Sequence, residues 1–150
     1  MTTIVDYDDL LSLAGSDLGT SDWIDLTQQR IDTFADATDD HQWIHVDRER
    51  ALLGPFGGTI AHGFLTLALI APMLGQLLDV RGANTTVNYG LDKVRFVSPV
   101  PAGSRVRLRG NVVEVLPIAS GFHLTTDVVV ETEFDAKPSV VARTIQRFYQ

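Results

Sequence analysis

The chain has 150 residues, 45% of them hydrophobic, which suits one folded domain over residues 1–150 and excludes a disordered chain. It contains no cysteine, which excludes disulfides, thiolate metal sites and cysteine nucleophiles and is compatible with the cytoplasmic location that we expect. Its net charge of −7 argues against nucleic acid as a partner, and residues 1–6 lack the basic start and apolar core of a secretory signal.

The first forty residues favour helices with one short strand. Asp6–Gly15 has the pattern of a short helix that ends at a glycine, and Trp23–Leu26 alternates apolar and polar residues like a strand. Thr27 is a good N-cap for a helix over about Gln28–Ala37. We expect Thr38–Asp40 to end this helix, because Asp and Thr side chains bond to their own backbone.

The middle of the chain contains a glycine-rich loop and the longest apolar run. Asp47–Leu53 predicts a brief helix that is capped by Asp47 and stops at Gly54, and Gly57–Gly58 makes a loop that can lie flat against a ligand. The run from about Gly63 to Leu78 predicts a helix apolar on nearly all sides, and therefore wrapped by other structure. Pro72 predicts a kink and not an end. The run is too short to cross a bilayer, so we expect no membrane insertion.

The second half of the chain reads as strands joined by short turns. Val87–Val97 is strand-like, with Gly90 as a bulge, and Ser104–Val115, Phe122–Glu131 and Val140–Tyr149 alternate apolar and polar residues. Short connections favour antiparallel pairing. The sequence therefore predicts an α+β fold in which a curved antiparallel sheet wraps around one long hydrophobic helix.

Two side chains that can share acid–base work stand close together in the sequence. Asp40 alone would be interpreted as a helix-ending Asx turn, His45 alone as a structural histidine, and His62 as a residue that bonds the loop or the helix start. Asp40 and His45, however, lie five residues apart across what we expect to be a non-helical turn. Such a turn can direct both side chains into one cleft, where a carboxylate and an imidazole can divide general-base and general-acid roles.

Gly63 lies where the long helix is expected to begin. The first N–H groups of a helix have no internal partner, so the Gly63 amide could bind a thioester carbonyl oxygen that gains charge in the reaction. A glycine needed only for tight packing at the helix start is the alternative. The neighbouring Gly58, together with His62, is a candidate for support of this site.

The residues that carry these groups resemble a known family. The segment Phe34–Asp47, with Asp40-His41-Gln42-Trp43-Ile44-His45 inside it, and the segment Gly58–Phe64, with Ala61-His62-Gly63, resemble the MaoC-like, (R)-specific enoyl-CoA hydratases. The similarity is greatest to mycobacterial-type 3-hydroxyacyl-thioester dehydratases and nodulation-protein-N-like relatives, and runs from about Trp23 to the end. It implies a hotdog fold and a homodimer with substrate tunnels near the interface.

The resemblance assigns roles residue by residue. It implies that Asp40 and His45 hold and activate water for C3 of an enoyl thioester while C2 gains a proton, and that the Gly63 N–H binds the thioester carbonyl. It does not assign the individual proton transfers. The family commonly has Asn-Pro where this chain has Gln42-Trp43, and several members have serine where this chain has Ala71.

The expected function is thus the reversible hydration of trans-2-enoyl thioesters in fatty acid metabolism, with a coenzyme A thioester as substrate in preference to an acyl carrier protein, and no cofactor. An acyl-CoA thioesterase on the same fold and a non-catalytic acyl-thioester-binding module are the alternatives. We expect no metal site, because Asp40, His45 and His62 lack a recognised ligand spacing. Residues 81–150 carry 9 basic and 6 acidic side chains against 3 and 13 in residues 1–80, which fits either a solvated acidic surface or local sites for an anionic ligand.

Overall fold

A computed structural model describes residues 1–150 and contains eight strands, one 3₁₀ helix and five α-helices. No helix in it has the length and apolar character needed to cross a membrane. The strands are β1 Thr3–Asp6, β2 Asp17–Thr20, β3 Ile24–Asp25, β4 Leu78–Arg81, β5 Thr85–Phe96, β6 Arg105–Ile118, β7 Gly121–Thr132 and β8 Val140–Tyr149. The helices are the 3₁₀ helix η1 Tyr7–Leu13, α1 Gln28–Thr38, α2 Trp43–Val46, α3 Arg48–Leu52, α4 Gly63–Ala68 and α5 Ile70–Leu77.

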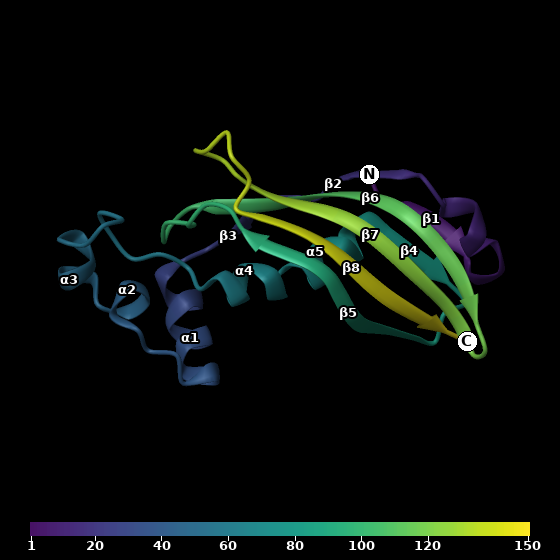
Figure 1. Ribbon diagram of the computed structural model, residues 1–150, viewed down its shortest axis with the longest axis horizontal. Coiled ribbons are helices and arrows are strands. Elements are labelled where there is room, and N and C mark those ends of the chain that lie inside the picture. Colours follow the sequence, from purple (N-terminus) through teal and green to yellow (C-terminus); the bar gives the residue numbers. More distant parts are fainter.

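The main sheet has the strand order β2-β6-β7-β8-β5, with β3 also paired to β6, and every pair in it is antiparallel. Its long strands curve together, and α4 and α5 run along one face of the sheet (Figure 1). The four strands predicted in the second half of the chain are β5 to β8, and the strand predicted over Trp23–Leu26 is β3. The register shift between Asn88 and Gly90 confirms the predicted bulge. The predicted α+β architecture of a curved antiparallel sheet around a central helix is confirmed.

The alternation of residues along the strands divides the sheet into a buried and a solvated face. In β6, Val106 and Leu108 are fully buried, whereas Arg105 and Arg107 lie on the outer face. Arg107 pairs with Glu131 of β7, and Arg105 pairs with Glu133, which follows β7. In β8, every second residue from Val140 is buried. This period of two is what a sheet covered on one face requires, and it confirms the faces predicted for β6 and β7.

The central helix is divided where the sequence predicts one continuous helix. α4 ends at Ala68 and α5 begins at Ile70, so the interruption lies at Leu69, upstream of the kink expected at Pro72. Proline has no N–H to offer the carbonyl four residues earlier, here that of Ala68, and its ring crowds that carbonyl. The Met73 N–H still donates to the Leu69 carbonyl at 3.2 Å, so the two helices stay in line.

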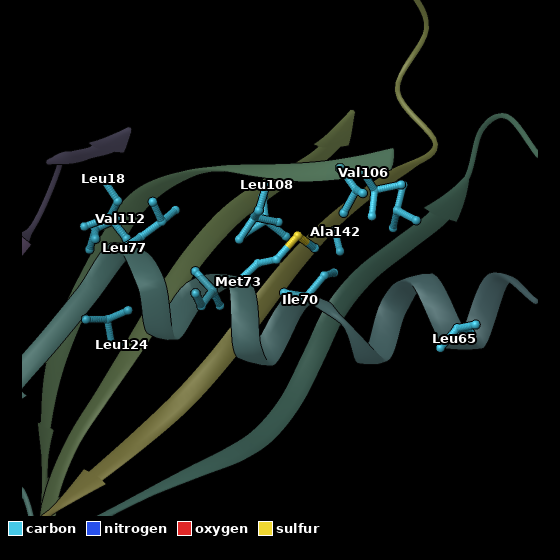
Figure 2. Close-up of a cluster of buried hydrophobic side chains, with 14 of the residues drawn as sticks. Leu18, Leu65, Ile70, Met73, Leu77, Val106, Leu108, Val112, Leu124 and Ala142 are labelled. Atoms are coloured by element: carbon cyan, nitrogen blue, oxygen red, sulfur yellow. The ribbon is translucent and has the colours of Figure 1, made fainter. Parts of the chain in front are cut away.

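The core lies between this helix pair and the sheet. Figure 2 shows Ile70, Met73 and Leu77 directed from α5 toward sheet residues such as Leu108 and Ala142. Met73 and Leu108 are fully buried, and burial of such a side chain contributes about 1.5–3 kcal/mol. The helix start is therefore fixed by packing along the rest of the helix, which matters for the groups placed there.

The N-terminal half departs from the predicted elements in several places, and β2 is one strand there that the sequence did not predict. The leading helix predicted over Asp6–Gly15 is the 3₁₀ helix η1, and it follows β1, which pairs with β4 in parallel. The predicted helix ending at Leu78 gives way there to β4, which the sequence did not predict. The turn between Asp40 and His45 was expected to be non-helical, but His45 lies on α2, a single helical turn.

Two helix caps are confirmed as predicted. The Thr27 side chain accepts a hydrogen bond from the Arg30 N–H at the start of α1. The Asp47 side chain accepts one from the Arg50 N–H at the start of α3. Figure 1 shows α1, α2 and α3 gathered at one end of the molecule, beyond the start of α4. The residues that follow α1 thereby lie close to the start of α4, and α2 lies beside both.

Candidate active site

A cavity of about 400 Å³ lies between α2, the start of α4, the end of β5 and the start of β8. Its only titratable side chains are those of Asp40, His45 and His62, and Gly63 also lines it. Four of the five predicted site residues are therefore brought together. Gly58 is not among the lining residues, and a Cβ added to it would meet no atom within 4 Å.

His45 is buried, with 6% of its surface exposed, and its hydrogen bond defines its tautomer. Its Nδ1 lies 2.7 Å from the Ile60 carbonyl oxygen. A carbonyl oxygen can only accept, so Nδ1 carries the hydrogen and Nε2 of the neutral ring keeps a free lone pair. Burial lowers the pKa of His45 from its usual 6.5 and the neighbouring His62 lowers it further, while the Ile60 bond and the Asp40 carboxylate act in the opposite direction. His45 is thus available as a neutral base.

His62 connects the other two side chains. It is 2% exposed, and its Nε2 donates to the backbone carbonyl oxygen of Asp40 at 2.9 Å. The same nitrogen lies 3.9 Å from Oδ2 of Asp40. Its ring stacks on that of His45, with centroids 3.8 Å apart and planes inclined by 24°. Asp40 follows Asp39, whose left-handed backbone (φ 59°) ends α1, and its carboxylate is half exposed.

Gly63 is the first residue of α4. The carbonyl before it, that of His62, accepts from the N–H groups of Leu65 and Thr66, whereas the N–H groups in the first turn of a helix have no partner inside it. A Cβ added to Gly63 would lie 2.9 Å from Cδ1 of Phe96. The position therefore combines an amide that can donate into the cavity with a close contact that only glycine permits.

Packing around Trp43 holds α2 in place. The guanidinium of Arg50 lies 4.3 Å from the Trp43 ring centroid. The ring also fills the space beside Gly54, where an added Cβ would lie 2.9 Å from Cζ3. The His45 N–H donates to the Gln42 carbonyl at 2.9 Å. The pair Gln42-Trp43, where the resemblance leads one to expect Asn-Pro, thus builds the turn that carries His45.

Gln28 is a supporting residue that the sequence did not reveal. Its side-chain Nε2 donates to the His45 carbonyl and to Oδ1 of Asp32, each at 2.7 Å, and its Oε1 accepts from the Thr59 hydroxyl. These bonds join α1, α2 and the segment before α4. No sequence signal marks this role, because glutamine in the first turn of a helix is common.

The three titratable groups also form the one cluster with metal-ligand types, since one ligand atom from each of Asp40, His45 and His62 lies within 4.8 Å of the others. The two rings stack nearly parallel, so their in-plane lone pairs lie in two nearly parallel planes. One nitrogen of each ring is already bonded to a backbone carbonyl. The arrangement therefore favours proton transfer over metal binding, and the absence of a metal stays a prediction.

Comparison with known proteins adds a family to this geometry. A family model described as a MaoC like domain matches residues 10–134. The chain belongs to the MaoC-like family. The 3-hydroxyacyl-thioester dehydratase Z of Mycobacterium tuberculosis strain H37Rv is 50% identical over 149 residues, 99% of each chain. Nodulation protein N of Rhizobium leguminosarum bv. viciae is 49% identical over 140 residues, 91% of this chain and 87% of that protein.

The fold of this MaoC-like protein is similar to that of a solved structure. The (R)-hydratase from A. caviae involved in PHA biosynthesis superposes with a TM-score of 0.72 at 22% identity, covering 89% of this chain and 94% of that one. At this identity the likeness concerns the fold alone. It confirms the predicted hotdog fold, and the family match confirms the resemblance drawn from Phe34–Asp47 and Gly58–Phe64.

Proposed function

We propose that the protein catalyses the reversible addition of water to trans-2-enoyl thioesters, giving (R)-3-hydroxyacyl thioesters. The observation that carries this proposal is the convergence of the Asp40 carboxylate, the free Nε2 of His45 and the start of α4 on one cavity. The name of one relative, 3-hydroxyacyl-thioester dehydratase Z, supports this reaction class, whereas the name of the other, nodulation protein N, states no reaction. The fold alone supports several activities, so the site decides.

The geometry supports a division of roles between the two side chains. Nε2 of His45 takes a proton from the water that attacks C3, because Nδ1–H is held by the Ile60 carbonyl. The Asp40 carboxylate accepts a hydrogen bond from the O–H that this water keeps, and it stabilises the imidazolium as it forms. The thioester oxygen gains negative charge and accepts from the Gly63 N–H. The imidazolium then returns a proton to C2, so one water is added and the pair is restored.

The test follows the loss of enoyl absorbance when crotonyl-CoA is the substrate. Asp40→Ala and His45→Ala should each lower kcat by about 10²-fold or more, as expected for loss of a general acid–base group. His41→Ala is the matched control, because His41 is an exposed histidine paired with Asp36 outside the cavity. Wild-type rates in both site variants would end the assignment.

Two alternatives give different products. A thioesterase on this fold would release free thiol from a saturated acyl-CoA, whereas a hydratase releases none. A non-catalytic acyl-binding module would bind the thioester and leave both substrates intact. The hydratase proposal is favoured because a neutral imidazole and a carboxylate face the same cavity, which a binding module does not need.

A second cavity supports a place for the acyl chain. It has a volume of about 210 Å³, and seven of its ten lining residues are hydrophobic. Leu67, Ile70 and Ala71 of α4 and α5 form one wall, and residues of β5 and β8 form the other. Residues of α4, β5 and β8 also border the cavity at Gly63, farther toward the start of α4. Coenzyme A is proposed as the carrier, and hydration rates on both carriers across acyl lengths would test this.

A homodimer formed through β5 is part of the proposal. β5 is the edge strand of the main sheet, and its side chains Val87, Tyr89, Leu91 and Phe96 are each more than 40% exposed. An exposed apolar edge strand is a site for pairing with another chain, here a second copy. Sedimentation equilibrium should give twice the chain mass of 16.5 kDa, and the mass of a single chain would refute the dimer. We further propose a cytoplasmic location, which a composition without cysteine supports.

A further inference from the structure

His62 is the one side chain that touches or adjoins all three groups of the proposed reaction. It bonds to the Asp40 backbone and stacks on His45, and it is the residue immediately before Gly63. The loop of Asp40, the turn of His45 and the start of α4 are separate segments of the chain. A single buried ring therefore joins the three segments whose relative positions set the reaction geometry.

The surroundings of His62 leave little freedom for its ring. It is 2% exposed, stacks on His45, and lies 4.9 Å from the Phe34 ring of α1 between centroids. Because the Asp40 carbonyl can only accept, Nε2 carries the hydrogen. Nδ1 then carries the lone pair, and it is buried without any hydrogen-bond partner. A second N–H at Nδ1 would have no acceptor, so the ring is held in one tautomer.

The two stacked rings consequently have opposite tautomers. His45 carries its hydrogen on Nδ1, which donates to the Ile60 carbonyl, and His62 carries its hydrogen on Nε2, which donates to the Asp40 carbonyl. Both bonds go to backbone and not to side chains, so the tautomers do not depend on the ionisation of Asp40. This arrangement presents the lone pair of His45 Nε2 to the cavity at the start of each reaction cycle, before it takes the proton of the attacking water.

We propose that His62 is a positioning residue for the hydration reaction, holding the Asp40 backbone by its Nε2–H and supporting the His45 ring by stacking. This inference rests on the proposed function for its catalytic meaning. His62 itself exchanges no proton with the substrate. Its removal displaces the carboxylate, loosens the base, or both, and a misplacement of about 1 Å can reduce turnover about 10²-fold.

The stack also bears on the protonation of His45. The titratable groups that face it across the cavity are Asp40 and His62, and every other residue lining the cavity is uncharged. On the α1 side, the Gln28 amide donates both to the His45 carbonyl and to the Asp32 carboxylate. Burial and His62 lower the pKa of His45, while Asp40 raises it. Removing the His62 ring exposes His45 to water and removes one lowering influence, so its pKa should rise.

Two variants separate the two roles. His62→Gln keeps an amide donor for the Asp40 carbonyl and loses the ring, whereas His62→Phe keeps a stacked ring and loses the donor. We expect kcat for crotonyl-CoA to fall about 10- to 100-fold in both, with KM changed about twofold or less. The acid limb of the pH–rate profile should move to higher pH in His62→Gln, which loses both the burial of His45 by the ring and the influence of His62, and should move less in His62→Phe, which keeps the burial. His41→Gln is the control for loss of a histidine outside the cavity.

Nitrogen NMR of the histidine rings provides a readout that does not need activity. In the wild type, His45 should show the Nδ1–H tautomer and His62 the Nε2–H tautomer, and the titration midpoint of His45 should rise in His62→Gln. Failure of the proposed function with these spectra observed would leave the positioning contacts standing without a reaction. The inference is overturned if both variants retain kcat within about twofold of His41→Gln, or if the His45 tautomer and midpoint are the same in all three proteins.

Discussion

Replacing Gly63 by alanine tests how closely the start of α4 is packed. The new Cβ would lie 2.9 Å from Cδ1 and 3.0 Å from Cγ of Phe96, well inside the contact distance of about 3.5–4.0 Å between carbon atoms. The backbone of Gly63 is held by the buried helix, so the Phe96 ring has to move. Overpacking of this kind costs about 1–3 kcal/mol. For a chain of this length, the melting temperature should fall by about 3–9 °C.

The same substitution should also reduce activity. It leaves the Gly63 N–H in place but adds a methyl group beside it, on a wall of the cavity that Phe96 also lines. Loss of one preorganised donor to a developing oxyanion costs about 2.7–4 kcal/mol, or about 10²–10³ in kcat. Because the amide itself remains, we expect the lower end, about 10²-fold. Initial rates with crotonyl-CoA and thermal unfolding by circular dichroism measure the two effects.

A second substitution distinguishes packing from carbonyl binding. Phe96→Ala in the Gly63→Ala background removes Cγ and the ring atoms that meet the new Cβ, so the melting temperature should return toward that of Phe96→Ala alone. If kcat stays low while stability recovers, the methyl group obstructs the approach of the thioester oxygen. If kcat recovers in parallel with stability, Gly63 serves packing only, and the assignment of its amide to the carbonyl is refuted.

Three further outcomes are expected. The acid limb of kcat/KM should lie below pH 6.5, because burial lowers the pKa of His45. For the same reason the free energy of unfolding should decrease as the pH falls below 6.5, because His45 binds a proton more readily in the unfolded chain than in the folded one. Met73→Ala should lower the free energy of unfolding by about 2–5 kcal/mol in urea titrations, against about 0.5 or less for the exposed Leu52→Ala. Dialysis against EDTA should leave the hydration rate unchanged, and a loss restored by zinc would contradict the acid–base assignment.

The strands could be predicted because one face of the sheet is buried and the other is solvated. Apolar and polar residues therefore alternate with a period of two along β6 to β8, and Gly90 marks the bulge in β5. The pairing of β1 with β4 was missed, because it joins residues 3–6 to residues 78–81 and neither segment carries a local signal of it. The helix is interrupted at Leu69 and not at Pro72, where the kink was predicted, because proline disturbs the turn that precedes it.

The members of the site could be predicted from residue type and spacing, but not their contacts. Asp40 and His45 are close in the sequence, so a short turn suffices to bring them together. The bond from His62 to the Asp40 carbonyl spans 22 residues, and that from Gln28 to the His45 carbonyl spans 17. Such contacts depend on how α1 packs beside α4, which local patterns do not encode.

The segment Thr59–Ala61 explains how the core fixes a site made from separate segments. Its backbone bonds to the sheet side of the molecule, with the Ala61 N–H donating to the Val100 carbonyl at 2.8 Å and the Ala102 N–H to the Thr59 carbonyl at 2.9 Å. Ile60 faces α2 instead: its N–H donates to the Ile44 carbonyl at 3.0 Å, and its carbonyl holds Nδ1 of His45. The segment then leads into His62 and α4. The position of the His45 imidazole is therefore fixed by backbone hydrogen bonds of a segment that is itself bonded to its neighbours. Side-chain substitutions in this segment should consequently affect the site less than insertions or deletions that change its length.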